Sequence, residues 1–292
     1  MNKALIGFQN WWFECRPVWR ETLLRLLGAV LLIDALGMVG LYQHYYTEDG
    51  ILSAAGRRAM MAVNDDWNLF SLLPFESAIF SWSVLGLYIV ALGFMIRGRR
   101  LRLWCGLTFL CSSYFYARFP YIDNGGFGVA RILLFCAVFA PLSKPSVWSG
   151  VVGWGSRFVQ LQISYIYLTN AVCKLSGSTW LNGTALYYIG RSTDFHRLNF
   201  SWIFDNVPLL LISTQILPVL YILVSLGLWW RWTRLPCLIF VFGLHLMIDL
   251  TMVVPVFGPA MILGALFFVT EKDLELWRSW ARRVAPARFR TA

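Results

Sequence analysis

A lysine near the end of a long apolar stretch is the residue best suited to chemistry. Lys174 follows the apolar run 158–172, inside the segment YLTNAVCKLSGSTWLNGTAL. An amine in hydrocarbon is costly unless it faces a bundle interior, finds a partner or gives up its proton, so such residues indicate functional sites. Burial favours the neutral amine, which is a general base, whereas a nearby carboxylate favours the ammonium ion. The alternative is a lysine whose side chain extends to the membrane interface.

The residues before Lys174 predict one polar face on an otherwise apolar helix. Gln160, Tyr167 and Lys174 recur every seven residues, and Asn170 lies one turn before the lysine. Residues at this spacing share a helix face, which should point into the bundle. The functional interpretation is a polar pocket that opens toward the outer side. The alternative is a polar network that only fixes the register of the helices.

Charged residues in other apolar stretches lie at a similar depth. At about 1.5 Å per residue, Asp34, Lys174 and Asp249 lie roughly 18 to 24 Å from the starts of their stretches. His245 lies one turn before Asp249, and Arg131 lies just inside a fourth stretch. Because unpaired charges in a membrane are severely penalised, we expect these groups to face one another, with an acid near Lys174. The expected catalytic residues are Lys174, His245, Asp249 and Arg131, and the expected pocket residues are Asp34, Gln160, Tyr167, Asn170, Trp180 and Gly183.

The composition indicates a multi-pass membrane protein. Hydrophobic residues make up 58% of the 292 residues, charged residues make up 14%, and the mean hydropathy is +0.61. A soluble domain of this composition would have too little polar surface to cover itself. The aromatic content of 17%, with 15 Trp, fits the interfacial belts of membrane proteins.

The apolar stretches predict an all-α fold, a polytopic transmembrane helical bundle of about eight spans. Several stretches are shorter than the ~20 residues that a perpendicular helix needs. Lys and Arg gather in the short loops of one side, so we expect both termini to be cytoplasmic, in an inner (plasma) membrane. The predicted spans are 22–41, 78–96, 103–117, 128–142, 158–174, 208–230, 235–252 and 256–270.

The regions outside the spans complete a single transmembrane domain over residues 1–292. We expect an interfacial amphipathic helix at about residues 1–20, with no cleavable signal peptide, and a basic tail at about 271–292. The tail should lie on anionic lipid, and the formal net charge of +10 requires no nucleic acid as a partner. Two longer external segments, 45–77 and 176–207, should form short helices that cap a cleft, or an inert cover.

Cysteine and histidine usage argues against a metal site or a disulfide framework. The six Cys are scattered without a CxxC pair, and the three His form no HExxH pattern. We therefore expect no metal.

Three segments resemble the HTTM family, which includes the vitamin K-dependent γ-glutamyl carboxylase and many bacterial proteins. The most specific pattern is KLxxxxWxxGxAL, which begins at Lys174 and contains Trp180 and Gly183. The segment YTEDGIL after the first span and the run NGGFGVARILLF at 124–135 are also similar to family signatures. The resemblance covers most of the chain, about 16–270.

The resemblance implies a role for Lys174 as a base. In the carboxylase, the matching lysine deprotonates reduced vitamin K, and His245 lies near a histidine of the family's late hydrophobic block. The chain lacks the carboxylase's large lumenal C-terminal domain and has Cys173 where the carboxylase has a second lysine. Glutamate carboxylation is therefore not implied. The size and loops are more similar to the bacterial branch near the sporulation-delaying-protein B family, which is implicated in the maturation of exported peptide toxins.

The leading hypothesis is an inner-membrane enzyme that uses a reduced, vitamin K-like quinone to modify or mature an exported peptide. Lys174 would be the base, and Arg131 and Asp249 would orient it. The alternative is a non-catalytic transporter of an apolar solute, or a membrane assembly partner for a secreted peptide, although no repeat between the halves favours transport. A redox partner is a third interpretation, against which the isolated cysteines argue.

Overall fold

The chain folds as a bundle of α-helices. Within the described part of the chain there is no strand, which confirms the all-α prediction there. The computed structural model describes residues 7, 11–12, 15, 17–64, 69–139, 154–192, 197–198 and 200–284.

Each predicted apolar stretch coincides with a helix. Their mostly apolar side chains suit these helices to an environment without water, in which backbone groups must bond within the helix. The helices are α2 (Arg20–Met38), α5 (Ala78–Arg97), α6 (Leu101–Arg118), α7 (Gly125–Val138), α9 (Gly155–Leu175), α13 (Val207–Gly227), α14 (Arg234–Thr251) and α15 (Phe257–Leu266).

Four helical segments of the described chain are long and apolar enough to cross a membrane. The helices α7 and α15 are apolar but shorter. At about 1.5 Å per residue they extend over roughly 21 and 15 Å, less than the ~30 Å of a hydrocarbon core. The apolar helices are those of a membrane protein, whereas the other four predicted spans stay a prediction. The four segments that are long and apolar enough are Arg20–Tyr46, Ala78–Arg97, Val207–Gly227 and Arg234–Thr251.

Local sequence signals set several helix ends. The Ser77 hydroxyl accepts a hydrogen bond from the Phe80 amide at the start of α5, and the Asn124 side chain accepts one from the Gly126 amide at the start of α7. Such side chains satisfy amide groups that have no partner within the helix. At the end of α5, Gly98 has a φ of 74°, a left-handed conformation that glycine adopts at little cost.

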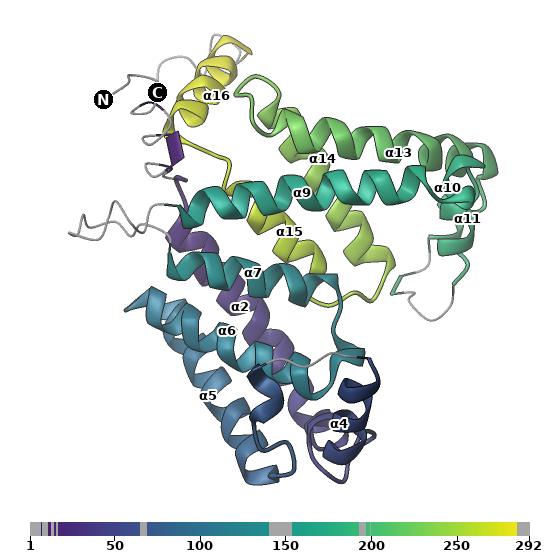
Figure 1. Ribbon diagram of the computed structural model, residues 1–292. Coiled ribbons are helices and arrows are strands. Elements are labelled where there is room, and N and C mark those ends of the chain that lie inside the picture. The colour runs from purple at the N-terminus through teal and green to yellow at the C-terminus, as the bar shows by residue number, and fades with distance from the viewer. Residues whose placement is uncertain are drawn as a thin grey trace.

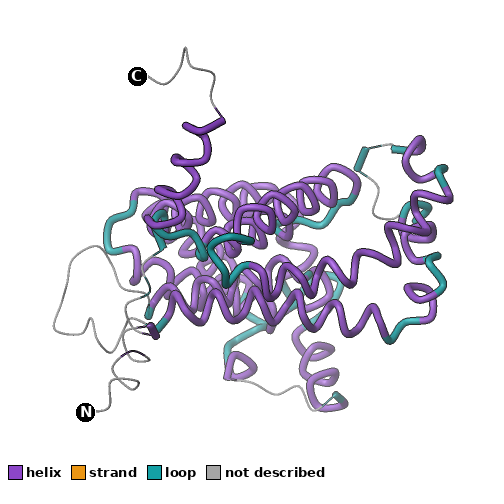
Figure 2. The backbone as a smooth tube through the Cα atoms, turned by 90° about the horizontal axis from the view of Figure 1, so that it is seen from above, coloured by secondary structure: helices purple, strands orange, loops and turns teal. Residues whose placement is uncertain are grey.

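The helices form two groups joined by α7 and α15 (Figure 1). One group contains α2, α5 and α6, and the other contains α9, α13 and α14. The helix α15 packs against α2, α7, α9 and α14, and α7 packs against α6 and α9. Seen from above in Figure 2, the long helices run beside one another along the bundle. The core therefore lies around α7 and α15.

Both longer segments between spans contain short helices. The first contains α3 (Tyr42–Tyr46), α4 (Ala54–Val63) and the 3₁₀ turn η2 (Leu69–Leu72), and the 3₁₀ turn η1 (Val39–Leu41) precedes α3. The second contains α10 (Ser178–Leu181), α11 (Ala185–Ile189) and α12 (Ser201–Phe204), and a further turn, η3 (Pro120–Ile122), precedes α7. The polar residues Asp65, Asp66, Asp194 and His196, which lie in these two segments, fall outside the described residues.

Two buried arginines tie the first segment to the end of α6. The Nε of Arg57, which is 2% exposed, donates to the Ala117 carbonyl at 2.7 Å. The guanidinium of Arg118, which is fully buried, donates to the carbonyls of Leu52 and Thr47 at 2.8 Å. Hydrogen bonds from a charged donor are stronger than neutral ones, so these contacts fix the segment in place.

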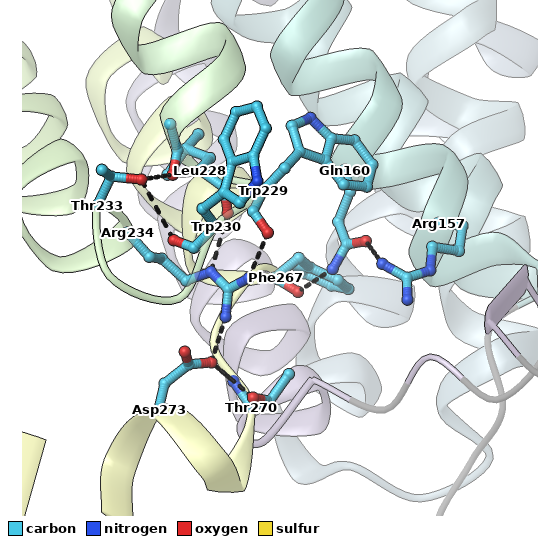
Figure 3. Close-up of polar contacts among 11 residues, drawn as sticks. Arg157, Gln160, Leu228, Trp229, Trp230, Thr233, Arg234, Phe267, Thr270 and Asp273 are labelled. Atoms are coloured by element: carbon cyan, nitrogen blue, oxygen red, sulfur yellow. Dashed lines mark hydrogen bonds and ion pairs between the residues drawn. The ribbon is translucent and has the colours of Figure 1, made fainter. Parts of the chain in front are cut away.

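The start of the basic tail is a helix, α16 (Glu271–Val284), which lies at the opposite end of the bundle from α10 and α11 (Figure 1). The buried Asp273 carboxylate forms an ion pair with Arg234 and accepts hydrogen bonds from the Thr270 amide and hydroxyl (Figure 3). The Asp273 side chain thus satisfies the Thr270 amide, which has no partner within the helix. Residues 285–292 of the tail and most of 1–20 lie outside the described residues.

Candidate functional site

A cavity of about 520 Å³ lies between α9, α10, α13 and α14. Most of its wall consists of apolar side chains from α13 and α14, among them Leu217 and Met247. Lys174 and Asn170 of α9 also line it, together with Trp180 of α10. A mostly apolar cavity with a few polar groups is the usual form of a small-molecule site.

The Lys174 amine is half-buried at the cavity wall. Its Nζ donates to Asn170 Oδ1 at 3.3 Å and lies 4.8 Å from the ring centres of both Trp180 and Tyr221. The ion pairs of the described residues do not include one between Lys174 and a carboxylate. The described residues therefore place no acid within salt-bridge reach of Lys174.

Aromatic and polar contacts extend from Lys174 into the bundle. The Tyr221 ring packs edge-on against Tyr167 at 5.3 Å, and the Tyr167 hydroxyl is hydrogen-bonded to His245 Nε2 at 2.8 Å. Tyr167 and His245 are each 1% exposed, and His245 Nδ1 has no partner among the described residues. Tyr221 thus links Lys174, Asn170 and Trp180 to Tyr167 and His245, so five of the ten predicted site residues form one connected set.

The environment of Lys174 acts on its amine in two opposite ways. The Trp180 and Tyr221 rings stabilise an ammonium ion by about 0.5–2 kcal/mol through their negative faces. Apolar surroundings without a paired carboxylate favour the neutral amine. A neutral amine accepts a proton from a ligand hydroxyl, whereas an ammonium ion donates hydrogen bonds or binds an anion. The site can therefore act as a base or as a fixed cation.

Gly183 shapes the turn that follows Trp180. Its φ of 77° is left-handed, and a Cβ atom there would lie 2.6 Å from Leu211 Cδ2. Only glycine adopts this conformation at little cost and also leaves room for α13. Gly183 therefore positions Trp180 rather than lining the cavity.

Asp34 and Arg131 line a different cavity, of about 210 Å³, formed by α2, α3, α5, α6 and α7. Arg131 forms a bidentate ion pair with Asp123, with two hydrogen bonds of 2.7 Å, and its guanidinium lies 4.7 Å from the Tyr116 ring centre. The prediction that Asp34 and Arg131 share a pocket with Lys174 is wrong. Asp34 and Arg131 match Lys174 in their expected depth in the membrane, but they line one cavity and Lys174 lines the other.

Asp249 lies near the end of α14, with its carboxylate at the start of α15, and it does not line the Lys174 cavity. Its carboxylate accepts a hydrogen bond from the Gly258 amide in the first turn of α15 and interacts electrostatically with Arg197. A carboxylate at a helix N-terminus satisfies free amide groups and the positive end of the helix dipole. Asp249 therefore has a capping role, and the prediction that it faces Lys174 is wrong.

The segment before α15 forms a wall shared by the two cavities. Val254 and Phe257 line the larger cavity, and Pro255 lines the smaller one. Val256 has a φ of 66°, which is a strained conformation for a β-branched residue. The chain accepts this strain where the segment turns between the two cavities.

Gln160 lies at the opposite end of α9 from Lys174. Its Nε2 donates to the Phe267 carbonyl at 2.8 Å, and its Oε1 accepts a hydrogen bond from Arg157 at 2.6 Å (Figure 3). Fourteen residues at about 1.5 Å each place it roughly 21 Å from Lys174. The prediction that Gln160 belongs to the Lys174 pocket is therefore wrong, and the residue joins α9 to the end of α15.

Sequence reasoning missed two residues of these cavities. Tyr221 is the single tyrosine of the apolar helix α13. Its hydroxyl, in an otherwise apolar helix, was the sequence signal that could have identified it as a site residue. Asp123 precedes Arg131 by eight residues in the loop before α7. A search for acids flanking each span, and not only within it, would have found this partner of Arg131.

In comparisons with known proteins, no protein-family model, no curated protein and no solved structure matches this chain.

Proposed function

We propose that this chain is a membrane enzyme that uses a reduced quinone, or a similar apolar cosubstrate, with Lys174 as the base. The observation that carries the proposal is the position of the Lys174 amine. It is the side-chain cation among the described residues that line the 520 Å³ cavity, and it has no carboxylate partner within them. The resemblance of KLxxxxWxxGxAL to the HTTM pattern supports the same assignment.

The cavity fits a flat ring with polar substituents and an apolar tail. Apolar walls from α13 and α14 suit the ring and tail, while Lys174 and Asn170 supply polar contacts on the α9 side. When bound, a reduced quinone supplies a ring hydroxyl of low acidity and two electrons, for which dioxygen would be the acceptor.

The residues of the chain have separate roles in this proposal. Lys174 Nζ accepts the hydroxyl proton, because apolar surroundings keep the amine neutral and therefore available as a base. Asn170 holds the amine in place through the 3.3 Å hydrogen bond, and the Trp180 and Tyr221 rings exclude water and stabilise the ammonium ion that forms. The buried Tyr167 and His245 support Tyr221 from inside the bundle.

A titration with reduced quinone tests this proposal. In dodecyl maltoside, a short-chain reduced quinone should raise the melting temperature of the full chain in a saturable way. Leu217→Trp, which fills the cavity, should abolish the shift, whereas Ile216→Trp, on the exposed face of the same helix, should leave it unchanged. Equal shifts in the two variants would contradict binding in this cavity.

We also propose that all eight helices cross the inner membrane, that both termini are cytoplasmic, and that α4 and α10–α12 form an outer cap. The distribution of Lys and Arg between the two sides supports this topology. Reporter fusions after Arg100 and Arg282 should be cytoplasmic, and fusions after Gly50 and Ser192 should be external. An external signal after Arg282 would exclude an even number of spans. The cavity would then lie toward the outer side, where an exported peptide is the substrate we propose.

A second candidate function follows from the two rings beside Lys174. Because aromatic faces at 4.8 Å favour the ammonium ion, the amine is equally suited to act as a fixed cation. The chain would then bind an anionic apolar solute or the carboxylate of a peptide without catalysis, as a transporter or an assembly partner. Arginine in place of Lys174 separates the two functions.

A further inference from the structure

The 210 Å³ cavity between α2, α3, α5, α6 and α7 is separate from the site proposed for Lys174. The two cavities have no lining residue in common. The smaller one is lined by one unpaired acid, one ion pair and several tyrosines, which is a different chemistry from the apolar wall of the larger one. Its ligand should therefore be of a different class.

Three polar groups of this cavity have no partner within the described residues. Asp34 forms no hydrogen bond or ion pair there and is half-buried. Tyr46 and Tyr88, which are 3% and 5% exposed, line the same cavity, and the hydrogen bonds of the described residues include none to their hydroxyls. Polar groups that converge on one cavity and lack partners in the protein favour a ligand that supplies the missing bonds.

The charges of the cavity determine the sign of that ligand. Asp123 and Arg131 neutralise each other through their bidentate ion pair, so the Asp34 carboxylate leaves the cavity with one net negative charge. A half-buried carboxylate without a partner has lost part of its hydration, and a cation compensates for that loss. Aromatic faces attract cations as well, and the lining includes Tyr45, Tyr46 and Phe115.

We propose that this cavity binds a small organic ammonium ion, with Asp34 as its counter-ion and the Tyr46 and Tyr88 hydroxyls as further hydrogen-bond acceptors. The Asp34 carboxylate would repel an anion, and a neutral alcohol would leave the charge of the carboxylate without a counter-ion. The same ammonium chemistry occurs in free amines and in the ethanolamine headgroup of lipids. The proposal concerns binding only and does not depend on the reaction at Lys174.

Titration of the full chain with four probes of similar size tests this assignment. In dodecyl maltoside, butylammonium should raise the melting temperature in a saturable way, whereas butanol and butyrate should not. Butyltrimethylammonium, which keeps the charge but has no N–H donor, should raise it less than butylammonium. Asp34→Asn, which keeps the shape of the side chain, should weaken butylammonium binding by about 10- to 100-fold, the loss expected for a charged hydrogen bond. Tyr88→Phe keeps the ring and should weaken binding less.

Two further experiments show which cavity binds butylammonium and whether the natural ligand is a lipid headgroup or a free amine. Leu217→Trp, in the other cavity, should leave butylammonium binding unchanged even if the proposed quinone site is lost. If the ethanolamine headgroup is the natural ligand, phosphatidylethanolamine added to the micelles should shift the butylammonium titration to higher concentration; if a free amine is, the titration should not move. Equal binding of butanol or butyrate, or undiminished butylammonium binding by Asp34→Asn, would overturn the proposal.

Discussion

Lys174→Arg is expected to fold normally and to lose the quinol-dependent reaction. Arginine keeps the positive charge and the cation–π contacts with Trp180 and Tyr221, but its guanidinium does not lose its proton in proteins. Loss of a positioned general base typically lowers a rate by about 10²- to 10⁴-fold. The measurement is the oxidation of reduced quinone by dissolved dioxygen in the presence of the chain in nanodiscs, together with the maturation of any peptide encoded beside this gene.

A methionine variant completes the comparison. Because no carboxylate of the described residues pairs with Lys174, Lys174→Met should cost only the cation–π contribution of about 0.5–2 kcal/mol. A loss of about 3–5 kcal/mol would instead reveal an unpaired buried charge. Full activity of Lys174→Arg would exclude the lysine as the base and favour the fixed-cation function.

Asp273→Ala is expected to cause the largest loss of stability among the substitutions considered. The side chain of Asp273 is 1% exposed and that of Arg234 is 11% exposed, so removal of the carboxylate leaves a nearly buried guanidinium without its partner. Breaking such a pair from one side costs about 3–5 kcal/mol. The start of α16 also loses its cap at Thr270. The melting temperature in detergent measures the effect.

A control on the same helix separates the ion pair from the charge of the tail. Glu275→Ala removes an exposed carboxylate from α16 and should change the melting temperature little. If both variants melt at the same temperature as the wild type, the ion pair of Asp273 does not stabilise the attachment of α16 to the bundle.

The positions of the helices could be predicted because apolar stretches and their caps are local signals. The prediction began the second span at residue 78, where Ser77 caps α5. It ended the fourth and eighth spans too late, because α7 and α15 stop at Val138 and Leu266. An apolar residue favours burial whether or not it lies in a helix, so hydropathy alone does not show where a short helix ends.

The candidate site was predicted only in part, because depth along a helix is visible in a sequence and the direction of each helix face is not. Lys174 and Tyr167 share a helix face and one network, since they lie two turns apart on α9. Asp34 has a similar depth, but the face of α2 that carries it lines the smaller cavity. Tertiary packing sets these faces, and it depends on contacts between residues far apart in the chain.

Loop residues account for the remaining differences. Asp123 neutralises Arg131 from the loop before α7, and Gly258 provides the amide that Asp249 caps. Both contacts satisfy local backbone or charge requirements with nearby partners. The partner of a polar residue inside an apolar stretch should therefore be sought first in the loop nearest to that residue.

The position of a bound reduced-quinone analogue is the most direct test of the central claim. A cryo-EM structure of the full chain in nanodiscs, with the analogue present, should show its ring in the cavity between α9, α10, α13 and α14. One ring hydroxyl should lie within about 2.6–3.2 Å of Lys174 Nζ, the reach of a general base. A bound analogue whose hydroxyls are all remote from Lys174, or an analogue bound only outside this cavity, would contradict the assignment of Lys174 as the base.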